Sequence, residues 1–148
     1  MDTNLIVKKS ITLHAPIEKV WDALTNPTII KKYLFGTNTV SDWKVGSPII
    51  FTGTWNDKPY EDKGIILALE REKLLKYSYW SSLAGTSDSP ENYVNVTFSL
   101  SREGNKVVLT LEQDNCRPSN RAIIRLRIGI WFWRLSKNYW RANKSSEM

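Results

Sequence analysis

Residues 118–142, PSNRAIIRLRIGIWFWRLSKNYWRA, form the longest apolar segment in the second half of the chain. As a helix, the segment places five apolar side chains along one stripe: Ile124, Ile128, Trp131, Leu135 and Tyr139. Gly129 and the strand-forming residues around it, from Ile128 to Trp133, favour an extended conformation instead. We give the stripe more weight and predict a long C-terminal helix over residues 118–142.

The residues before this segment predict strands that need such a cover. Apolar and polar residues alternate over residues 4–14, 37–42, 48–55, 61–70, 74–80, 92–101 and 105–113. Between the first two of these segments, Ala15-Pro16 and Asn26-Pro27 each begin a short helix, and Gly36 ends the second. Each strand has one apolar face, and residues 118–142 are the only later segment long and apolar enough to cover it.

Length and charge restrict the class of protein. The 148 residues fit one domain that is large enough to bury a core. Residues 1–116 hold 13 Lys and Arg against 14 Asp and Glu, whereas residues 117–148 hold 8 against 1. The net charge of +6 therefore belongs to the C-terminal segment, and the rest of the chain offers no cationic face for nucleic acid.

The N-terminus has no long apolar core of a signal peptide, and no apolar run approaches the roughly 20 residues of a membrane span. Cys116 is the only cysteine, so no internal disulfide forms. These features predict a soluble cytoplasmic protein. Arg and Trp side chains in residues 118–142 would also suit an anionic membrane surface. A helix packed on the sheet uses its apolar stripe internally, however, and so we expect no membrane partner.

Several short strings, in one order, resemble a known family. They are APIEKVWDAL at 15–24, YLFG at 33–36, SDWKVGSP at 41–48, Trp55 through Gly64, YSYWS at 77–81, PENY at 90–93 and LEQDN at 111–115. Over about residues 10–115 the chain is similar to the family of the activator of heat-shock-protein-90 ATPase homologue. That family is part of the START-like (SRPBCC) superfamily, with the birch-pollen allergen and the polyketide cyclases.

The resemblance implies an α+β helix-grip fold in a single domain over residues 1–148. In this fold a curved antiparallel sheet surrounds a long C-terminal helix, two short helices follow the first strand, and an apolar cavity lies between sheet and long helix. After Asn115 the chain departs from the family, with Cys116-Arg117-Pro118 in place of an acidic, polar helix start. A change of reading frame would explain this, since one choice of codons for Ile128–Arg134, regrouped by one base, encodes Trp-Asn-Leu-Val-Leu-Glu, which is family-like.

The resemblance also implies three hypotheses for function. We adopt the first, a non-enzymatic protein that binds a small hydrophobic molecule in the cavity. The second is a co-chaperone that stimulates a heat-shock-protein-90-type ATPase, although the chain holds only the single domain and lacks the separate N-terminal domain of the eukaryotic activators. The third is a cyclase- or hydrolase-type enzyme. Polar groups that converge inside the cavity would favour the enzyme, whereas a dry aromatic cavity favours the binder.

Reactive side chains are too few for a metal centre or a covalent mechanism. His14 is the only histidine, and no phosphate loop, nucleophile elbow or dinucleotide fingerprint is present. We therefore predict no catalytic residue, no metal and no cofactor. The acidic side chains are expected to be solvated: Asp22, Asp42, Asp57, Glu61, Asp62, Glu70 and Glu72.

Aromatic residues are the stronger signal, because they come from most of the predicted elements. Any single one is expected to pack the core, but ligand pockets are mostly apolar and aromatic, so some of the set should line the cavity. The candidate cavity-lining residues are Trp21, Tyr33, Phe35, Trp43, Phe51, Trp55, Tyr77, Tyr79, Phe98 and Trp131.

Overall fold

A computed structural model describes residues 6–33, 36–55, 57–82 and 87–114. Seven strands form one antiparallel sheet in the order β1-β7-β6-β5-β4-β3-β2. They are β1 (Val7–Leu13), β2 (Asn38–Ser41), β3 (Pro48–Trp55), β4 (Lys58–Glu70), β5 (Leu74–Ser81), β6 (Val94–Glu103) and β7 (Lys106–Asp114). The predicted α+β class and the order of these elements are confirmed. The predicted C-terminal helix over 118–142 lies outside the described residues.

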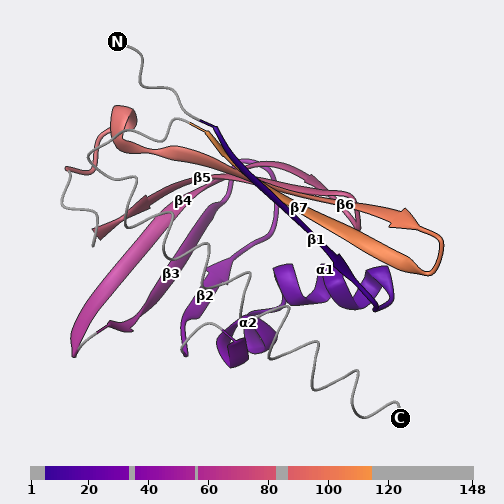
Figure 1. Cartoon of the computed structure of the whole chain (residues 1–148). Helices are drawn as coiled ribbons and strands as arrows, with labels where there is room; N and C mark the ends of the chain where they lie inside the picture. The colour runs from indigo at the N-terminus through magenta and orange to yellow at the C-terminus, as the bar shows by residue number, and fades with distance from the viewer. Residues whose placement is uncertain (1–5, 34–35, 56, 83–86, 115–148) are drawn as a thin grey trace.

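The sheet is a meander from β2 to β7, and β1 pairs with the last strand, β7. The described residues hold two α-helices, α1 (Ile17–Thr25) and α2 (Pro27–Tyr33), which lie on the same side of the curved sheet (Figure 1). The first helix contacts β6, and the second contacts β2 and α1. We call the side of the sheet that faces the helices the inner face.

Both helices begin as their sequences predict. Pro16 lies just before the first turn of α1, which buries the apolar stripe Ile17, Val20, Ala23 and Leu24. Asn26 ends α1 by donating its backbone N–H to the carbonyl of Asp22. Its side chain then accepts the backbone N–H of Thr28 at 3.0 Å, which caps the start of α2. One asparagine therefore separates the two helices.

The hairpin between β3 and β4 is tighter than predicted. The sequence indicates a four-residue turn over 56–59, yet Lys58 and Pro59 already pair with Trp55 and Thr54. Asp57 adopts φ 65°, a conformation that short polar residues tolerate, and so the chain reverses within two residues.

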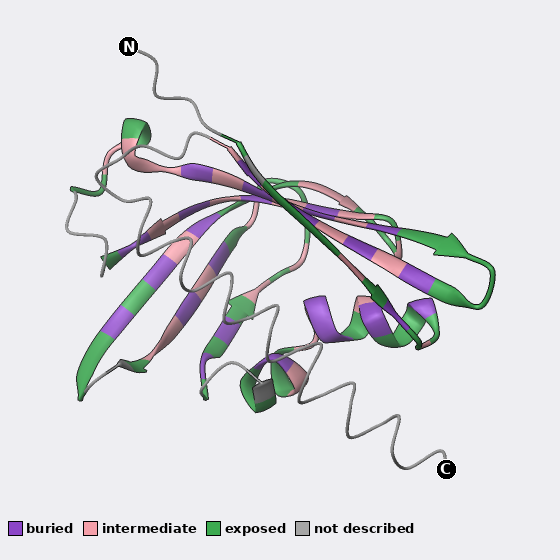
Figure 2. Cartoon of the chain, in the orientation of Figure 1, coloured by how far each residue is buried: buried purple, intermediate pink, exposed green. Residues whose placement is uncertain are grey.

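Burial alternates along β5, β6 and β7, where Figure 2 shows purple segments separated by pink ones, and the inner face carries the buried side chains. Most of them are apolar and form one core with the stripe of α1. Two glycines let the sheet pack closely. A Cβ on Gly53 would lie 2.6 Å from the Tyr60 hydroxyl, and one on Gly64 would lie 1.6 Å from the Ser78 carbonyl oxygen. Glycine at these two positions leaves the space that the Tyr60 side chain and the Ser78 backbone occupy.

Candidate functional site

Four of the predicted aromatic residues meet on the inner face. Phe51 of β3, Tyr77 and Tyr79 of β5 and Phe98 of β6 are all buried. Neighbouring rings have centroids 5.9 to 6.4 Å apart, in tilted or edge-on arrangements that aromatic pairs prefer. The cross-strand register brings these residues together, since Tyr77 lies opposite Val96 and Leu75 lies opposite Phe98.

Buried polar groups lie at one end of the same face. Asp62 of β4 is 0% exposed, and its Oδ2 accepts a hydrogen bond from the Tyr79 hydroxyl at 2.6 Å. Thr37 and the Tyr60 hydroxyl form a second buried bond, at 2.5 Å. The expectation that Asp62 is solvated is therefore wrong. Asp62 faces Phe51 on one side and Ser81 on the other, which places its side chain on the inner face.

An open pocket of about 480 Å³ lies at the other end of the inner face, next to α1. Two of the predicted residues, Trp21 of α1 and Trp43 of the loop between β2 and β3, line it together with Leu69 at the end of β4. All three are partly buried and pack against the core. The polar side chains at this pocket, which the sequence analysis did not single out as ligand-binding, are Asp22, Thr25 and Arg71.

The backbone holds Trp43 firmly in place. Its φ is 55°, a left-handed conformation that is uncommon for a bulky residue. The Trp43 N–H donates to the Ser41 hydroxyl at 3.0 Å. The rest of the loop is tied to β4, because Gly46 N–H donates to the Ile66 carbonyl and Ile66 N–H donates to the Ser47 carbonyl. This wall of the pocket is therefore preorganised.

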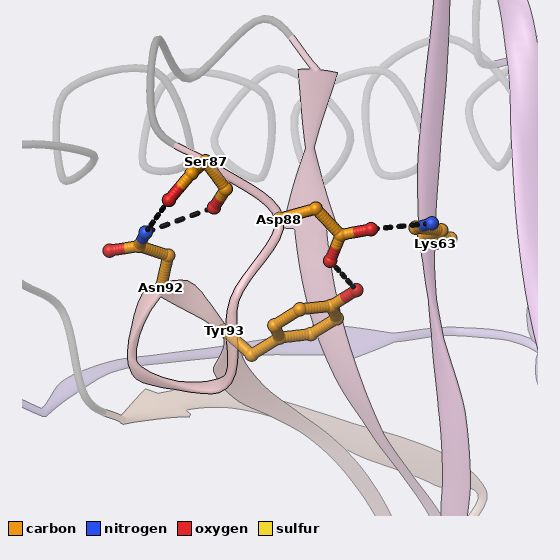
Figure 3. Close-up of polar contacts among 5 residues, drawn as sticks. All are labelled: Lys63, Ser87, Asp88, Asn92 and Tyr93. Carbon is orange, nitrogen blue, oxygen red and sulfur yellow. Dashed lines mark hydrogen bonds and ion pairs between the residues drawn. The ribbon is translucent and has the colours of Figure 1, made fainter.

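The outer face carries a cluster of rings and charges that sequence reasoning missed, and Figure 3 shows the contacts of its members Lys63, Asp88 and Tyr93. Asp88, in the segment after β5, pairs with Lys63 of β4 at 2.6 Å and accepts the Tyr93 hydroxyl at 2.6 Å. The Tyr93 ring stacks on Trp80 of β5, and the Lys63 ammonium lies 5.8 Å from the centre of a Trp80 ring. The signal that could have indicated this cluster is the pairing of Lys63 with Trp80 on neighbouring strands, which requires the register of β4 and β5.

Three pKa values reflect these contacts. The hydrogen bonds from Lys63 and then Tyr93 lower the pKa of Asp88 below its usual 3.8. The hydrogen bond to Asp88 raises the pKa of Lys63 above 10.5. Burial, followed by the bond to Asp88, raises the pKa of Tyr93 to about 12. The cluster anchors the segment Ser87–Tyr93 to the sheet across the neutral pH range.

The other predicted site residues are not tested by the structure. Phe35 and Trp131 lie outside the described residues, and so do the side chains of Tyr33 and Trp55. Cys116 lies outside as well, and His14 is exposed after β1. In the described ranges, no three His, Cys, Asp or Glu side chains gather as metal ligands. Neither α1 nor α2 is long and apolar enough to cross a membrane.

Comparisons with solved structures find close relatives of this fold. ChR145 from Cytophaga hutchinsonii is 43% identical, with a TM-score of 0.80 and a match over 99% of each chain. Protein MLL2253 from Mesorhizobium loti is 25% identical, with a TM-score of 0.70 over 90% of this chain and 95% of the other. The Aha1 dimer from Colwellia psychrerythraea is 16% identical, with a TM-score of 0.67 over 89% and 93%. No curated protein matches the chain.

A family model agrees with the resemblance seen in the sequence. The model of the Activator of Hsp90 ATPase homolog 1-like protein matches residues 14–126. The match continues past Asn115, so the family likeness ends later in the chain than the sequence strings indicate. With three quarters of its residues matched and a relative at 43% identity, the chain belongs to the Activator of Hsp90 ATPase homolog 1-like family.

Proposed function

We propose that this protein is a non-enzymatic binder of a small hydrophobic molecule, held between the inner face of the sheet and the predicted C-terminal helix. One observation carries the proposal: the 480 Å³ pocket walled by Trp21, Trp43 and Leu69. Its volume lies within the range of small-molecule sites, and its two tryptophan walls are of the aromatic kind that such sites favour.

The buried aromatic rings extend this apolar surface beyond the pocket. Phe51, Tyr77 and Phe98 line the inner face, against which the pocket walls pack. The Asp62–Tyr79 pair does not make the pocket a catalytic site. Asp62 is seven residues before Leu69 on β4, a distance of roughly 23 Å along a strand. At that distance the Asp62–Tyr79 pair does not reach a ligand in the pocket. We therefore assign this hydrogen bond to the packing of the sheet and not to catalysis.

The binding test uses N-phenyl-1-naphthylamine, a neutral apolar dye whose emission rises in an apolar site. We expect saturable binding to the full chain with quenching of Trp emission. Trp21→Ala and Trp43→Ala should each weaken binding at least fivefold, because each removes one wall of the pocket.

Trp80→Phe is the matched control. It also removes an indole, but Trp80 contacts Tyr93 and Lys63 on the outer face. We expect this variant to bind the dye as tightly as the parent chain. Absence of saturable dye binding, or equal loss of binding in all three variants, would show that the tryptophan pocket is not a ligand site.

A stimulator of a heat-shock-protein-90-type ATPase is the second candidate. Its support is a set of exposed apolar side chains on the sheet, Val40 of β2 and Ile65 and Leu67 of β4, whose exposed fractions are 65%, 47% and 43%. A partner protein would cover such a surface. The chaperone's ATP hydrolysis rate, measured with the parent chain and with Ile65→Asp, tests this. A rate that neither chain changes removes the candidate.

A further inference from the structure

The tryptophan pocket carries two opposite charges that the hydrophobic-ligand proposal does not use. Asp22 of α1 and Arg71 of the turn after β4 both line it. Asp22 is exposed, and its carboxylate oxygens contact the Asn26 side-chain amide at 3.3 and 3.5 Å. The Arg71 side chain is 83% exposed, and its Nε lies 3.6 Å from Glu72 Oε2, beyond the usual length of a hydrogen bond. Both charges are therefore available to a ligand.

These two charges do not neutralise each other. The ion pairs formed within the described ranges join Lys63 to Asp88 and Arg71 to Glu72, and neither includes Asp22. Asp22 and Arg71 consequently lie on the same pocket with a gap between them. A molecule that carries both an ammonium group and a carboxylate group would bridge that gap.

The charges also disfavour ligands with a single charge. A purely cationic ligand meets Arg71, and a purely anionic ligand meets Asp22. The two tryptophans add a preference for a planar ring, because an indole offers a broad π-face for offset stacking. The Thr25 hydroxyl adds little, since it already donates to the Trp21 carbonyl at 2.9 Å.

We propose that the Trp21–Trp43 pocket binds a small zwitterion with a planar apolar ring, its ammonium group toward Asp22 and its carboxylate toward Arg71. This inference rests on the proposed function, because it names the class of ligand for the same pocket. The aromatic body supplies most of the binding, and the two charges select among aromatic molecules.

Four ligands that share the indole ring system but differ in charge test the inference by isothermal titration calorimetry at low salt. They are 3-methylindole, which is neutral, tryptamine, indole-3-propionate and tryptophan. We expect tryptophan to bind about threefold to tenfold more tightly than 3-methylindole, since exposed ion pairs contribute little each and salt screens them.

Charge-removing variants assign each contact. Asp22→Asn should weaken tryptophan and tryptamine two- to fivefold and leave 3-methylindole unchanged. Arg71→Gln should weaken tryptophan and indole-3-propionate to the same extent and leave tryptamine unchanged or tighter. Both residues are exposed, so neither variant is expected to affect folding. Glu91→Gln and Lys106→Gln, exposed charges far along the chain from the pocket residues, are the matched controls.

The outcomes separate the two proposals. If 3-methylindole binds and the charged ligands bind no differently in any variant, the pocket is an apolar site and the zwitterion inference is wrong. If none of the four ligands binds, while the dye also fails to bind, the proposed function itself is wrong. A preference for tryptamine over tryptophan that Asp22→Asn abolishes would also overturn the inference, in favour of a cation site.

Discussion

At the scale of single residues, Trp43 forms one wall of the candidate pocket in a strained backbone conformation. Its φ of 55° is costly for any side chain with a Cβ, by about 1 kcal/mol, and glycine adopts it freely. The hydrogen bond to Ser41 and the ties between the loop and β4 keep the residue there. Strained residues cluster at functional sites, which agrees with the place of Trp43 in the wall of the candidate pocket.

This strain gives a prediction about Trp43 that reverses the usual order of stability. Trp43→Gly should be more stable than Trp43→Ala by about 1 kcal/mol, because glycine removes the left-handed penalty that alanine keeps. Both variants lose the same pocket wall, so they should lose dye binding equally. Urea unfolding of the two variants measures the difference, and an alanine variant as stable as the glycine variant would show that the loop is not strained.

Gly64 is a residue at which even one methyl group is excluded. The added carbon would lie 1.6 Å from the backbone oxygen of Ser78, and a backbone atom in a sheet cannot rotate away. At Gly53 the nearest atom, 2.6 Å away, is the hydroxyl of Tyr60, which is the end of a side chain. Gly64→Ala should therefore destabilise the fold by about 3 kcal/mol or more, and Gly53→Ala by about 1–3 kcal/mol.

Thermal and urea unfolding of the two glycine variants check that order. The Gly53 variant is the matched control, since it adds the same methyl group to the neighbouring strand β3, also facing a close contact. A Gly64 variant that unfolds at the same urea concentration as the parent would mean that β4 and β5 separate easily at this point.

At the scale of elements, the helix starts and the positions of the strands along the chain were predictable because they depend on local chemistry. Proline at a helix start, asparagine at a cap and the period of apolar residues act within a few neighbours, and α1, α2 and all seven strands follow them. The β3–β4 hairpin was predicted two residues too long, because the sequence does not show that Asp57 adopts a positive φ.

The segment Ser87–Tyr93 is held by the Lys63–Asp88 ion pair and the Tyr93–Asp88 hydrogen bond, and so its anchoring to the sheet should depend on pH. The raised pKa of Tyr93, about 12, means that its stabilisation is complete below the unfolded value of 10.0 and is lost as the pH rises from 10 towards 12. The lowered pKa of Asp88 has the opposite sign. Its stabilisation is complete above 3.8 and is lost as the pH falls through the lower folded value.

Tyr93→Phe separates this contribution from other groups that titrate at high pH. The variant keeps a ring to stack on Trp80 but has no hydroxyl to ionise. Urea unfolding at pH 8, 10 and 11.5 should show a smaller loss of stability for the variant than for the parent chain. Equal losses would mean that the Tyr93 hydroxyl does not hold this segment to Asp88.

For the whole molecule, the predicted inner face was right where it depended on alternation and wrong where it depended on residue type. Phe51, Tyr77, Tyr79 and Phe98 were assigned to one interior, and the register places them there. Asp62 was expected in solvent because a carboxyl group is costly to bury alone. Its partner Tyr79 is 17 residues away on the next strand, so only the fold reveals the pair.

For the whole molecule, we expect the inner face to need more cover than the helices of the described residues supply. The inner face of a seven-stranded sheet meets two helices of nine and seven residues. Its buried side chains include Phe98, Leu109 and Val96. Exposing 200 Å² of such apolar surface costs about 5 kcal/mol, which is a large share of the stability of a domain of this size.

We therefore predict that a chain cut after Asn115 does not fold on its own. Circular dichroism should show that the truncated chain lacks a cooperative thermal transition, whereas the full chain melts cooperatively. A chain cut after residue 142 is the control, because it keeps the segment predicted as the C-terminal helix, and it should melt like the full chain. If the chain cut after Asn115 melts as late as the full chain, residues 116–148 do not cover the inner face. In that case an anionic membrane surface becomes the better partner for their basic and aromatic side chains.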